Sequence, residues 1–351
     1  MSKKILFILK RREDYNAILH SDVGLSTGLY NSASFMNDML VKQGIDSKLV
    51  VVTDNNCIDR EVNTHKPTHV IIEALWVVPE KFSVLQKLHP NVKWIIRVHS
   101  EMPFMAGEGM AMNWLGEYSN FDNVIIAMNA PRMLREVKMY LTHKKKWNEH
   151  TADERVIYLP NYYPQDYKGF KRYNKNSDVI NVACFGAIRP LKNHLVQAIA
   201  AIDFANQIGK KLRFHINAGR IEMQGQAAQH NLFGLFEQIV DGPHRLVNHQ
   251  WRPREEFLTL CAEMDIGMQC NFSETFNIVS ADLLSQGVPL VGSKEIPWAI
   301  DGCCADPTDS ADIVKKLISA YNWGWMNVKG NQLALTHYTN NTARIWNKYF
   351  T

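Results

Sequence analysis

The chain of 351 residues is longer than one hydrophobic core usually supports, and it predicts two domains of about 150 to 180 residues each. The composition, with 46% hydrophobic and 21% charged residues, is that of an ordinary soluble protein, and no apolar run approaches the ~20 residues of a membrane span. The net charge of +4 permits an anionic ligand or a nucleic acid without requiring either.

The first half of the chain alternates short apolar strands with amphipathic stretches. We predict a helix over 28–44 and strands at 4–10, 47–52, 69–76, 93–99 and 123–128. Strands that are apolar throughout and alternate with helices are typical of a parallel sheet that is covered on both faces.

A polar, aromatic and proline-bearing stretch, "PNYYPQDYKGFKRYNKNSD" (160–178), interrupts this alternation and has the composition of a linker. A second series follows, with strands predicted at 179–186, 212–219, 245–250, 265–270 and 288–293 and helices at 192–208, 227–239, 253–264 and 277–286. Residues 309–350 are predicted to form two or three helices without strands.

Two doubly wound, Rossmann-like α/β domains that face each other across a cleft are the simplest interpretation of this order. The predicted boundaries are 1–160 for the first domain, 161–178 for the linker, 179–325 for the second domain and 326–351 for a terminal helix that packs back on the first domain. In such sheets, ligands bind outside the carboxyl ends of the strands.

The first residues and the cysteines bear on where the protein is found. The apolar centre of "MSKKILFILKRRED" is too short for a signal peptide, so we expect a cytoplasmic protein that does not insert into membranes. The six cysteines are scattered in apolar surroundings without metal-ligand spacing, which is typical of reduced core thiols.

The stretch "SETFNIVSADLLSQGVPLVGS" (273–293) places Glu274 and Asp282 among apolar or small residues. Residues that commonly cap helices predict a helix from Asn277 to Gln286, so Glu274 lies in the preceding loop and Asp282 inside the helix. This arrangement suits a ligand with an anionic middle and hydroxyl groups at both ends. In the alternative interpretation, the two acids only cap and solubilise a surface helix.

The same stretch resembles the signature of the large retaining GT-B glycosyltransferase family, in which two acids eight positions apart lie inside a Ser-Glu-x-Phe and Gly-x-Pro-Val pattern. Other landmarks agree in order and spacing: "VHSE" (98–101), "YLPNYY" (158–163), "GAIRPLKN" (186–193) and "REEFLTLCAEMDIGMQCNFSE" (254–274). The likeness is close over most of 155–325 and loose over 1–150. It implies the GT-B fold and an enzyme that transfers a sugar, with retention, from a nucleotide diphosphate donor, most simply a UDP-sugar.

Carried over by residue, the resemblance implies that Glu274 binds the hydroxyl groups of the donor sugar and Asp282 the ribose. The family has Glu at the second position, so Asp282 departs from it by one methylene. The backbone N–H groups at the start of the helix can receive a phosphate, because a helix start offers unpaired donors and a partial positive charge. These groups belong to Thr275, Phe276 and Asn277.

The resemblance also assigns basic residues to the departing diphosphate. Lys192 falls where the family has its diphosphate lysine, in the loop that begins at Gly186. The family's arginine directly after this glycine is replaced by Ala187, so Arg189 is assigned that role. Cations beside a leaving nucleoside diphosphate stabilise charge that develops in the transition state. Solvated surface cations are the alternative interpretation.

Two residues of the first half complete the candidate site. His99 ends an apolar strand, and in the resembling family this histidine contacts the donor sugar; a hydrogen-bonded core histidine is the alternative. Gly28, in the turn "DVGLSTGLYNSASF" (22–35), would allow the backbone to approach the donor phosphate or the acceptor, unless it only permits a tight turn.

No metal and no cofactor are expected. The sequence contains no Asp-x-Asp, so the metal-bridged diphosphate site of the other major glycosyltransferase fold is missing, and the histidines show no zinc-type spacing. Without a carboxylate nucleophile in the motifs, the resemblance implies departure and attack on one face of the sugar, aided by Lys192 and Arg189.

Two other classes of function remain open. A nucleotide-sugar epimerase of similar fold would need acids for proton transfer, and Glu101 and Glu108 are its candidates. A binding module with a degenerate donor site is the second, although the presence of Lys192 and Glu274 argues against it.

The acceptor is the least determined feature of the sequence. Overall likeness to bacteriophage-encoded enzymes favours a hydroxymethylated pyrimidine in duplex DNA, with a saccharide or lipid-linked glycan as the alternative. Basic residues lie among aromatic or charged residues in three stretches, "KRRED" (10–14), "THKKKW" (142–147) and "YKGFKRYNK" (167–175). Such stretches can bind along a nucleic acid backbone. A solvated linker and helix end would give the same pattern.

Overall fold

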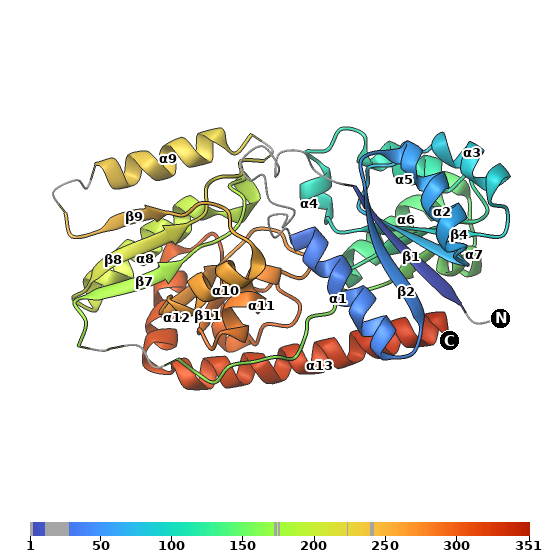
Figure 1. Ribbon diagram of the computed structural model, residues 1–351. Coiled ribbons are helices and arrows are strands. Elements are labelled where there is room, and N and C mark those ends of the chain that lie inside the picture. The colour runs from blue at the N-terminus through green and yellow to red at the C-terminus, as the bar shows by residue number, and fades with distance from the viewer. Residues whose placement is uncertain (1–2, 11–27, 172–173, 175, 223, 239–241) are drawn as a thin grey trace. The chain divides into compact units, whose positions relative to one another are not determined.

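The computed structural model describes residues 3–10, 28–171, 174, 176–222, 224–238 and 242–351 (Figure 1). The chain divides into two compact units. Unit 1 contains residues 28–164 and 339–351 together with the first strand, and unit 2 contains the described residues of 165–338. The division falls inside the stretch predicted as the linker, 161–178.

Unit 1 is a six-stranded parallel sheet in the order β2-β1-β3-β4-β5-β6. Its strands are β1 (Lys4–Lys10), β2 (Asp46–Val52), β3 (His69–Glu73), β4 (Lys93–Val98), β5 (Val124–Met128) and β6 (Val156–Tyr158). The helices are α1 (Gly28–Lys42), α2 (Ile58–His65), α3 (Lys81–Leu88), α4 (Met102–Met105), α5 (Ala111–Tyr118), α6 (Pro131–Lys145) and α7 (Glu149–Arg155), with a 3₁₀ turn, η2 (Asn55–Cys57).

The inner strands of unit 1, such as β1 and β3, are apolar on both faces because helices cover both. Successive residues of a strand point to opposite faces, so Ile5 and Phe7 join a core with α1 and the end of the last helix. Leu6 and Ile8 join a second core, with residues of α2, α3, α5 and α6. This explains why the strands are nearly unbroken apolar runs.

Unit 2 has a second six-stranded parallel sheet, in the order β12-β11-β10-β7-β8-β9. Its strands are β7 (Val179–Ala183), β8 (Lys211–Ile216), β9 (Arg245–Asn248), β10 (Ile266–Gln269), β11 (Leu290–Ser293) and β12 (Cys304–Ala305). The helices are α8 (His194–Gln207), α9 (Gln226–Glu237), α10 (Arg254–Ala262), α11 (Ile278–Ser285) and α12 (Ser310–Asn322), with 3₁₀ turns η3 (Pro190–Lys192) and η4 (Asp301–Cys303).

The last helix, α13 (Gly324–Phe350), contributes to both units. Residues 324–338 belong to unit 2 and residues 339–351 to unit 1. In unit 1, Trp346 stacks on Phe7 with 5.9 Å between ring centroids, and its indole Nε1 donates to the carbonyl of Pro160 at 2.9 Å. The end of the chain is therefore part of the first core.

The predicted α/β class with two doubly wound sheets is confirmed. Six of the predicted strands, β3, β4, β7, β8, β9 and β10, end earlier than predicted, whereas β1, β2, β5 and β11 end at the predicted residue; α1 ends at Lys42 rather than at residue 44. Two helices, α12 and α13, occupy 309–350 as expected, while the short strands β6 and β12 were not predicted. All six cysteines are free thiols, and in the described part of the chain no helix is both long and apolar enough to cross a membrane.

Candidate functional site

The loops that follow β7 and β10 lie together at the carboxyl edge of the second sheet. The Phe272 N–H donates to the carbonyl of Leu191 at 3.0 Å, which joins the two loops directly. Gly186 opens the first loop with φ +123°, a conformation that side chains rarely adopt, and its N–H donates to Asn217 Oδ1 at 2.6 Å. The predicted phosphate and sugar loops are thus brought side by side within unit 2.

Lys192 and Glu274 form an ion pair between these two loops. Their side chains are only 10% and 12% exposed. Burial disfavours the charged carboxylate, but Lys192 and Arg189 outweigh it and hold the pKa of Glu274 below its ordinary value. The Glu274 carboxylate is therefore ionised at neutral pH, while burial lowers the pKa of Lys192 against the opposing effect of Glu274.

Amide groups fix the orientation of the Glu274 carboxylate. Asn271 Nδ2 and Asn277 Nδ2 donate to Glu274 Oε2 at 2.9 and 3.1 Å, so both amides and Lys192 meet one oxygen. The same two amides donate to Gln269 Oε1, which holds them in place from the end of β10. The other oxygen, Oε1, accepts no hydrogen bond from the described residues and can receive a ligand hydroxyl.

The residues directly before α11 offer backbone donors beside this carboxylate. Asn277 is the N-cap: it has φ 60°, and its Oδ1 accepts from the Ser280 N–H at 2.8 Å. In the described chain, the backbone N–H groups of Phe276 and Asn277 donate to no other group, which leaves them for an anion. The third predicted donor, the Thr275 N–H, belongs to a residue that is only 7% exposed.

Asp282 lies inside α11 with 2% of its surface exposed. Its Oδ1 pairs with Arg254 Nη1 at 2.8 Å, and Arg254 is the first residue of α10. A buried carboxylate needs a partner, and the sequence did not identify Arg254 as that partner. Contact between Asp282 and a ribose remains a prediction, and such a ligand would share the carboxylate with this arginine.

Arg189, the second predicted diphosphate cation, has an acidic partner of its own. Its Nη1 lies 3.1 Å from Glu222 Oε2, and Glu222 also pairs with Arg220. Backbone bonds from Ile188 to Arg220 and from Glu222 to Ile188, of 2.9 and 3.0 Å, hold the two loops together. Arg189 is therefore anchored near Lys192, since its charge acts on both Lys192 and Glu274.

His99 belongs to unit 1, directly after β4. Its Nε2 contacts Glu73 Oε2 at 2.5 Å, and its Nδ1 lies 3.4 Å from Asn129 Nδ2. Glu73 is fully buried at the end of β3, and the sequence analysis did not single it out. A carboxylate that ends an apolar strand of a doubly wound sheet was the signal that could have identified it.

The other predicted residues of unit 1 have simpler surroundings. Gly28 is the first residue of α1, and residues 22–27 of its predicted turn lie outside the described residues. Glu101, a candidate acid for an epimerase, is 4% exposed and pairs with Arg132, while Glu108 is exposed. Among the described residues, no group of three or more His, Cys, Asp or Glu side chains could hold a metal ion.

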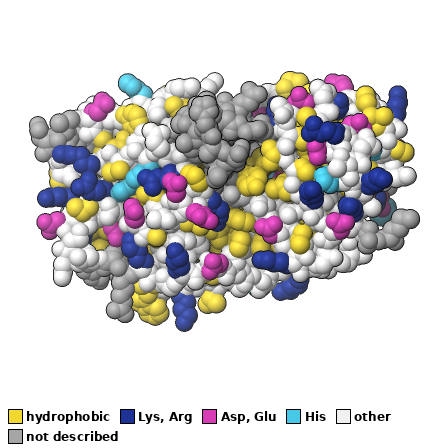
Figure 2. Space-filling view, in the orientation of Figure 1, with side chains coloured by type: hydrophobic (Ala, Val, Ile, Leu, Met, Phe, Trp, Pro, Cys, Tyr) yellow, Lys and Arg dark blue, Asp and Glu magenta, His cyan; other side chains and the backbone are white. Residues whose placement is uncertain are grey.

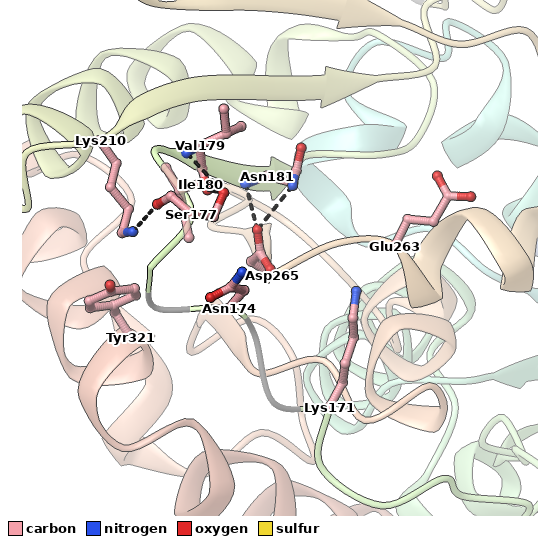
Figure 3. A pocket seen from close by; sticks show the side chains of 10 residues that line it. All are labelled: Lys171, Asn174, Ser177, Val179, Ile180, Asn181, Lys210, Glu263, Asp265 and Tyr321. Carbon is pink, nitrogen blue, oxygen red and sulfur yellow. Dashed lines mark hydrogen bonds between the residues drawn. The ribbon is translucent and has the colours of Figure 1, made fainter.

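A cavity of about 330 Å³ lies at the opposite, amino edge of the second sheet (Figure 3). Its wall includes Asn181, in the middle of β7, and Asp265, just before β10, and Asp265 Oδ2 accepts from the Asn181 N–H and Nδ2 at 2.8 and 3.1 Å. Lys210 donates to the carbonyl of Ser177. Since doubly wound sheets bind ligands at their carboxyl edge, this cavity is not the candidate site.

No protein-family model matches the sequence, and no curated protein matches it.

Solved structures, in contrast, match over nearly the whole chain. An α,α-trehalose-phosphate synthase (UDP-forming) from Burkholderia vietnamiensis has a TM-score of 0.71 at 11% identity, covering 100% of this chain and 96% of that one. A sucrose-phosphate synthase from Thermosynechococcus elongatus has a TM-score of 0.68 at 12% identity, covering 99% and 98%. A trehalose-6-phosphate protein from E. coli bound with UDP-2-fluoro glucose has a TM-score of 0.71 at 10% identity, covering 99% and 98%.

These similarities establish the fold. The chain has the two parallel α/β units of the GT-B glycosyltransferases, as the sequence predicted. At such low sequence identities the similarity shows the fold alone, so the function has to be argued from the site itself.

Proposed function

We propose that the protein is a glycosyltransferase that moves a sugar from a nucleotide diphosphate donor to a hydroxyl acceptor with retention at the anomeric carbon. The observation that carries this proposal is the ion pair of Lys192 and Glu274 at the carboxyl edge of the second sheet. Beside it lie Glu274 Oε1, to which no described residue donates, and the backbone N–H groups of Phe276 and Asn277, directly before α11. A cation, an acceptor and anion-binding amides together suit a sugar diphosphate.

Each group has a distinct role in this reaction. The departing nucleoside diphosphate gains negative charge, which Lys192 and Arg189 stabilise without a metal ion. Glu274 Oε1 accepts from a hydroxyl group of the donor sugar, and Asp282 accepts from the ribose. No carboxylate of the proposed site is assigned as a nucleophile, so departure and attack take place on one face of the sugar.

A UDP-sugar is the proposed donor. Support comes from the fold neighbours, of which one is described as UDP-forming and another as bound with UDP-2-fluoro glucose. The donor sugar itself is open, and a screen of nucleotide sugars would identify it.

The first experiment tests the reaction class. Nucleotide sugars are screened for thermal stabilisation of the protein, and the best donor is incubated with candidate acceptors while free nucleoside diphosphate and glycosylated product are measured. Release of the diphosphate together with a glycosylated acceptor is expected, and it should survive EDTA. An isomerised nucleotide sugar without release would indicate an epimerase, and loss of activity on chelation that magnesium or manganese restores would contradict the proposed diphosphate site.

Substitution of Glu274, in the loop before α11, and of Asp282, inside α11, should change different kinetic constants. Glu274→Gln should depress kcat strongly, because a sugar contact that strengthens in the transition state is weakened. Asp282→Asn should mainly raise the KM for the donor, because ribose binding is the same in the ground and transition states. Steady-state kinetics of both variants test this, and equal, small effects would refute the assignment.

A hydroxymethylated pyrimidine in DNA is the proposed acceptor. In support, Lys144 and Lys146 are exposed at the C-terminal end of α6, although Trp147 in the same segment is covered by the Arg155 guanidinium, 5.4 Å from its ring. On the face shown in Figure 2, Lys and Arg side chains lie among Asp and Glu. DNA contact would therefore depend on local clusters such as the end of α6.

If this acceptor is right, DNA binding should weaken steeply with salt. The logarithm of the binding constant should fall against the logarithm of the salt concentration with a slope of about −0.9 per phosphate contact. Replacing Lys144, Lys145 and Lys146 with Ala should lower that slope and leave donor binding unchanged, because the donor residues Lys192 and Glu274 belong to unit 2. Binding isotherms at several salt concentrations provide the measurement. Salt-insensitive transfer to a small glycoside, with none to hydroxymethylated DNA, would instead support a saccharide acceptor.

A further inference from the structure

A buried charge network surrounds His99 in unit 1. Arg97, on β4, is fully buried, and its Nη1 donates to both oxygens of Glu73 at 3.1 Å. Its Nε donates to the carbonyl of Leu159 at 3.1 Å, its Nη2 donates to Asn161 Oδ1, and its guanidinium lies 5.2 Å from the centre of the Trp346 ring. These contacts fix the arginine from several directions.

Glu73 is held as firmly as Arg97. The chain leaves β3 directly after Glu73, where Ala74 has φ +71°, a left-handed conformation that is uncommon for alanine. The Ala74 N–H donates to the Arg97 carbonyl at 2.9 Å, which maintains this turn. Unfavourable backbone conformations persist where the surrounding structure enforces them, often at functional sites. Here the turn keeps the carboxylate between Arg97 and His99.

This geometry selects one tautomer of His99. Its Nε2 is 2.5 Å from Glu73 Oε2 and 3.4 Å from Arg97 Nη1. An ionised carboxylate only accepts hydrogen bonds and a guanidinium only donates them, so the closer partner requires a proton on Nε2. Nδ1 is then the acceptor atom of the ring, and its 3.4 Å contact with Asn129 Nδ2 is longer than an ordinary hydrogen bond.

We infer that Glu73 is a positioning residue, which holds His99 neutral and protonated at Nε2 so that Nδ1 accepts a hydrogen bond from a hydroxyl group of the donor sugar. The sugar contact rests on the proposed function, whereas the protonation state rests on unit 1 alone. The Glu73 and Arg97 charges already balance, and a second cation beside Arg97 would be unfavourable. Burial and Arg97 accordingly lower the pKa of His99, against the opposing effect of Glu73. His99 therefore binds ligand as an acceptor and does not serve as a cation or a general acid.

The tautomer can be measured directly. Nitrogen-15 NMR of protein labelled in the imidazole rings distinguishes a protonated Nε2 from a protonated Nδ1, and the signals of His99 are those that disappear in His99→Gln. At pH 7 the wild-type protein should show His99 with Nε2 protonated and Nδ1 unprotonated. The imidazole should take up its second proton only below the usual histidine pKa of about 6.5. An unprotonated Nε2, or a doubly protonated, charged ring at pH 7, would overturn the inference.

Glu73→Gln tests the cause. Arg97 Nη1 would hold the oxygen of the substituted amide, so the NH₂ of that amide would face His99 Nε2 and donate to it. The proton should then move to Nδ1, and kcat/KM for the donor should fall about tenfold, the effect of losing one hydrogen bond. Glu101→Gln is the matched control: Glu101 is a buried, ion-paired acid of the same unit, and its substitution should leave the His99 tautomer unchanged.

The possible outcomes separate this inference from the proposed function. If the wild-type spectrum shows the Nε2–H tautomer but no nucleotide sugar is turned over, the proposed function fails and the positioning of His99 stands. If transfer occurs but the tautomer is Nδ1–H, the positioning fails and the function stands. Since the wild-type spectrum needs no variant, unfolding of Glu73→Gln would not prevent the test.

Discussion

Lys192→Ala should lower kcat for sugar transfer by about 10²-fold or more, the cost of removing one preorganised group that stabilises developing charge. The lysine is nearly buried and paired with Glu274, so the site keeps its cation in place before the donor arrives. The effect should fall mainly on kcat, because the diphosphate gains its extra charge only as the sugar leaves. Single-turnover measurements with saturating donor separate this step from binding.

A matched lysine of the same unit provides the control. Lys210 lies at the amino edge of the second sheet, where it donates to the carbonyl of Ser177 and lines the cavity of Figure 3. Lys210→Ala should leave kcat unchanged. If both variants lose activity equally, or if Lys192→Ala retains full kcat with a folded protein, the assignment of Lys192 to the leaving group is wrong.

The strands could be predicted from the sequence because buried parallel strands have a local signature. "KILFILK" and "HVIIEALW" are apolar throughout since each face is covered by helices, and a run of a few residues is sufficient to show this. The short strands β6 and β12 have three and two residues, too few to show any pattern. Strand ends also differ, because Glu73 ends β3 while the apolar run continues to Trp76.

The candidate site was only partly predictable, because the partners of its charges are distant in the sequence. Lys192 and Glu274 are 82 positions apart, and it was the family resemblance that joined them. No local sequence pattern connects Arg254 with Asp282, so the sequence does not identify this arginine as the partner of the acid. Glu73 and Arg97 lie on neighbouring strands, so only the strand order β3-β4 brings them together.

Arg97→Met should destabilise unit 1 by about 3–5 kcal/mol, because it leaves the Glu73 carboxylate buried without its cation. Denaturant unfolding, followed by a signal from unit 1, measures the change in the free energy of unfolding. Removing both charges in Glu73→Leu/Arg97→Met should recover much of the loss, since apolar groups can replace a buried ion pair at little cost. Arg60→Met is the control: Arg60 pairs with Glu61 but is 69% exposed, and such surface pairs contribute little to stability. A loss for Arg97→Met no larger than that for Arg60→Met would mean that water or another group reaches Glu73, and the network around His99 would then not be rigid.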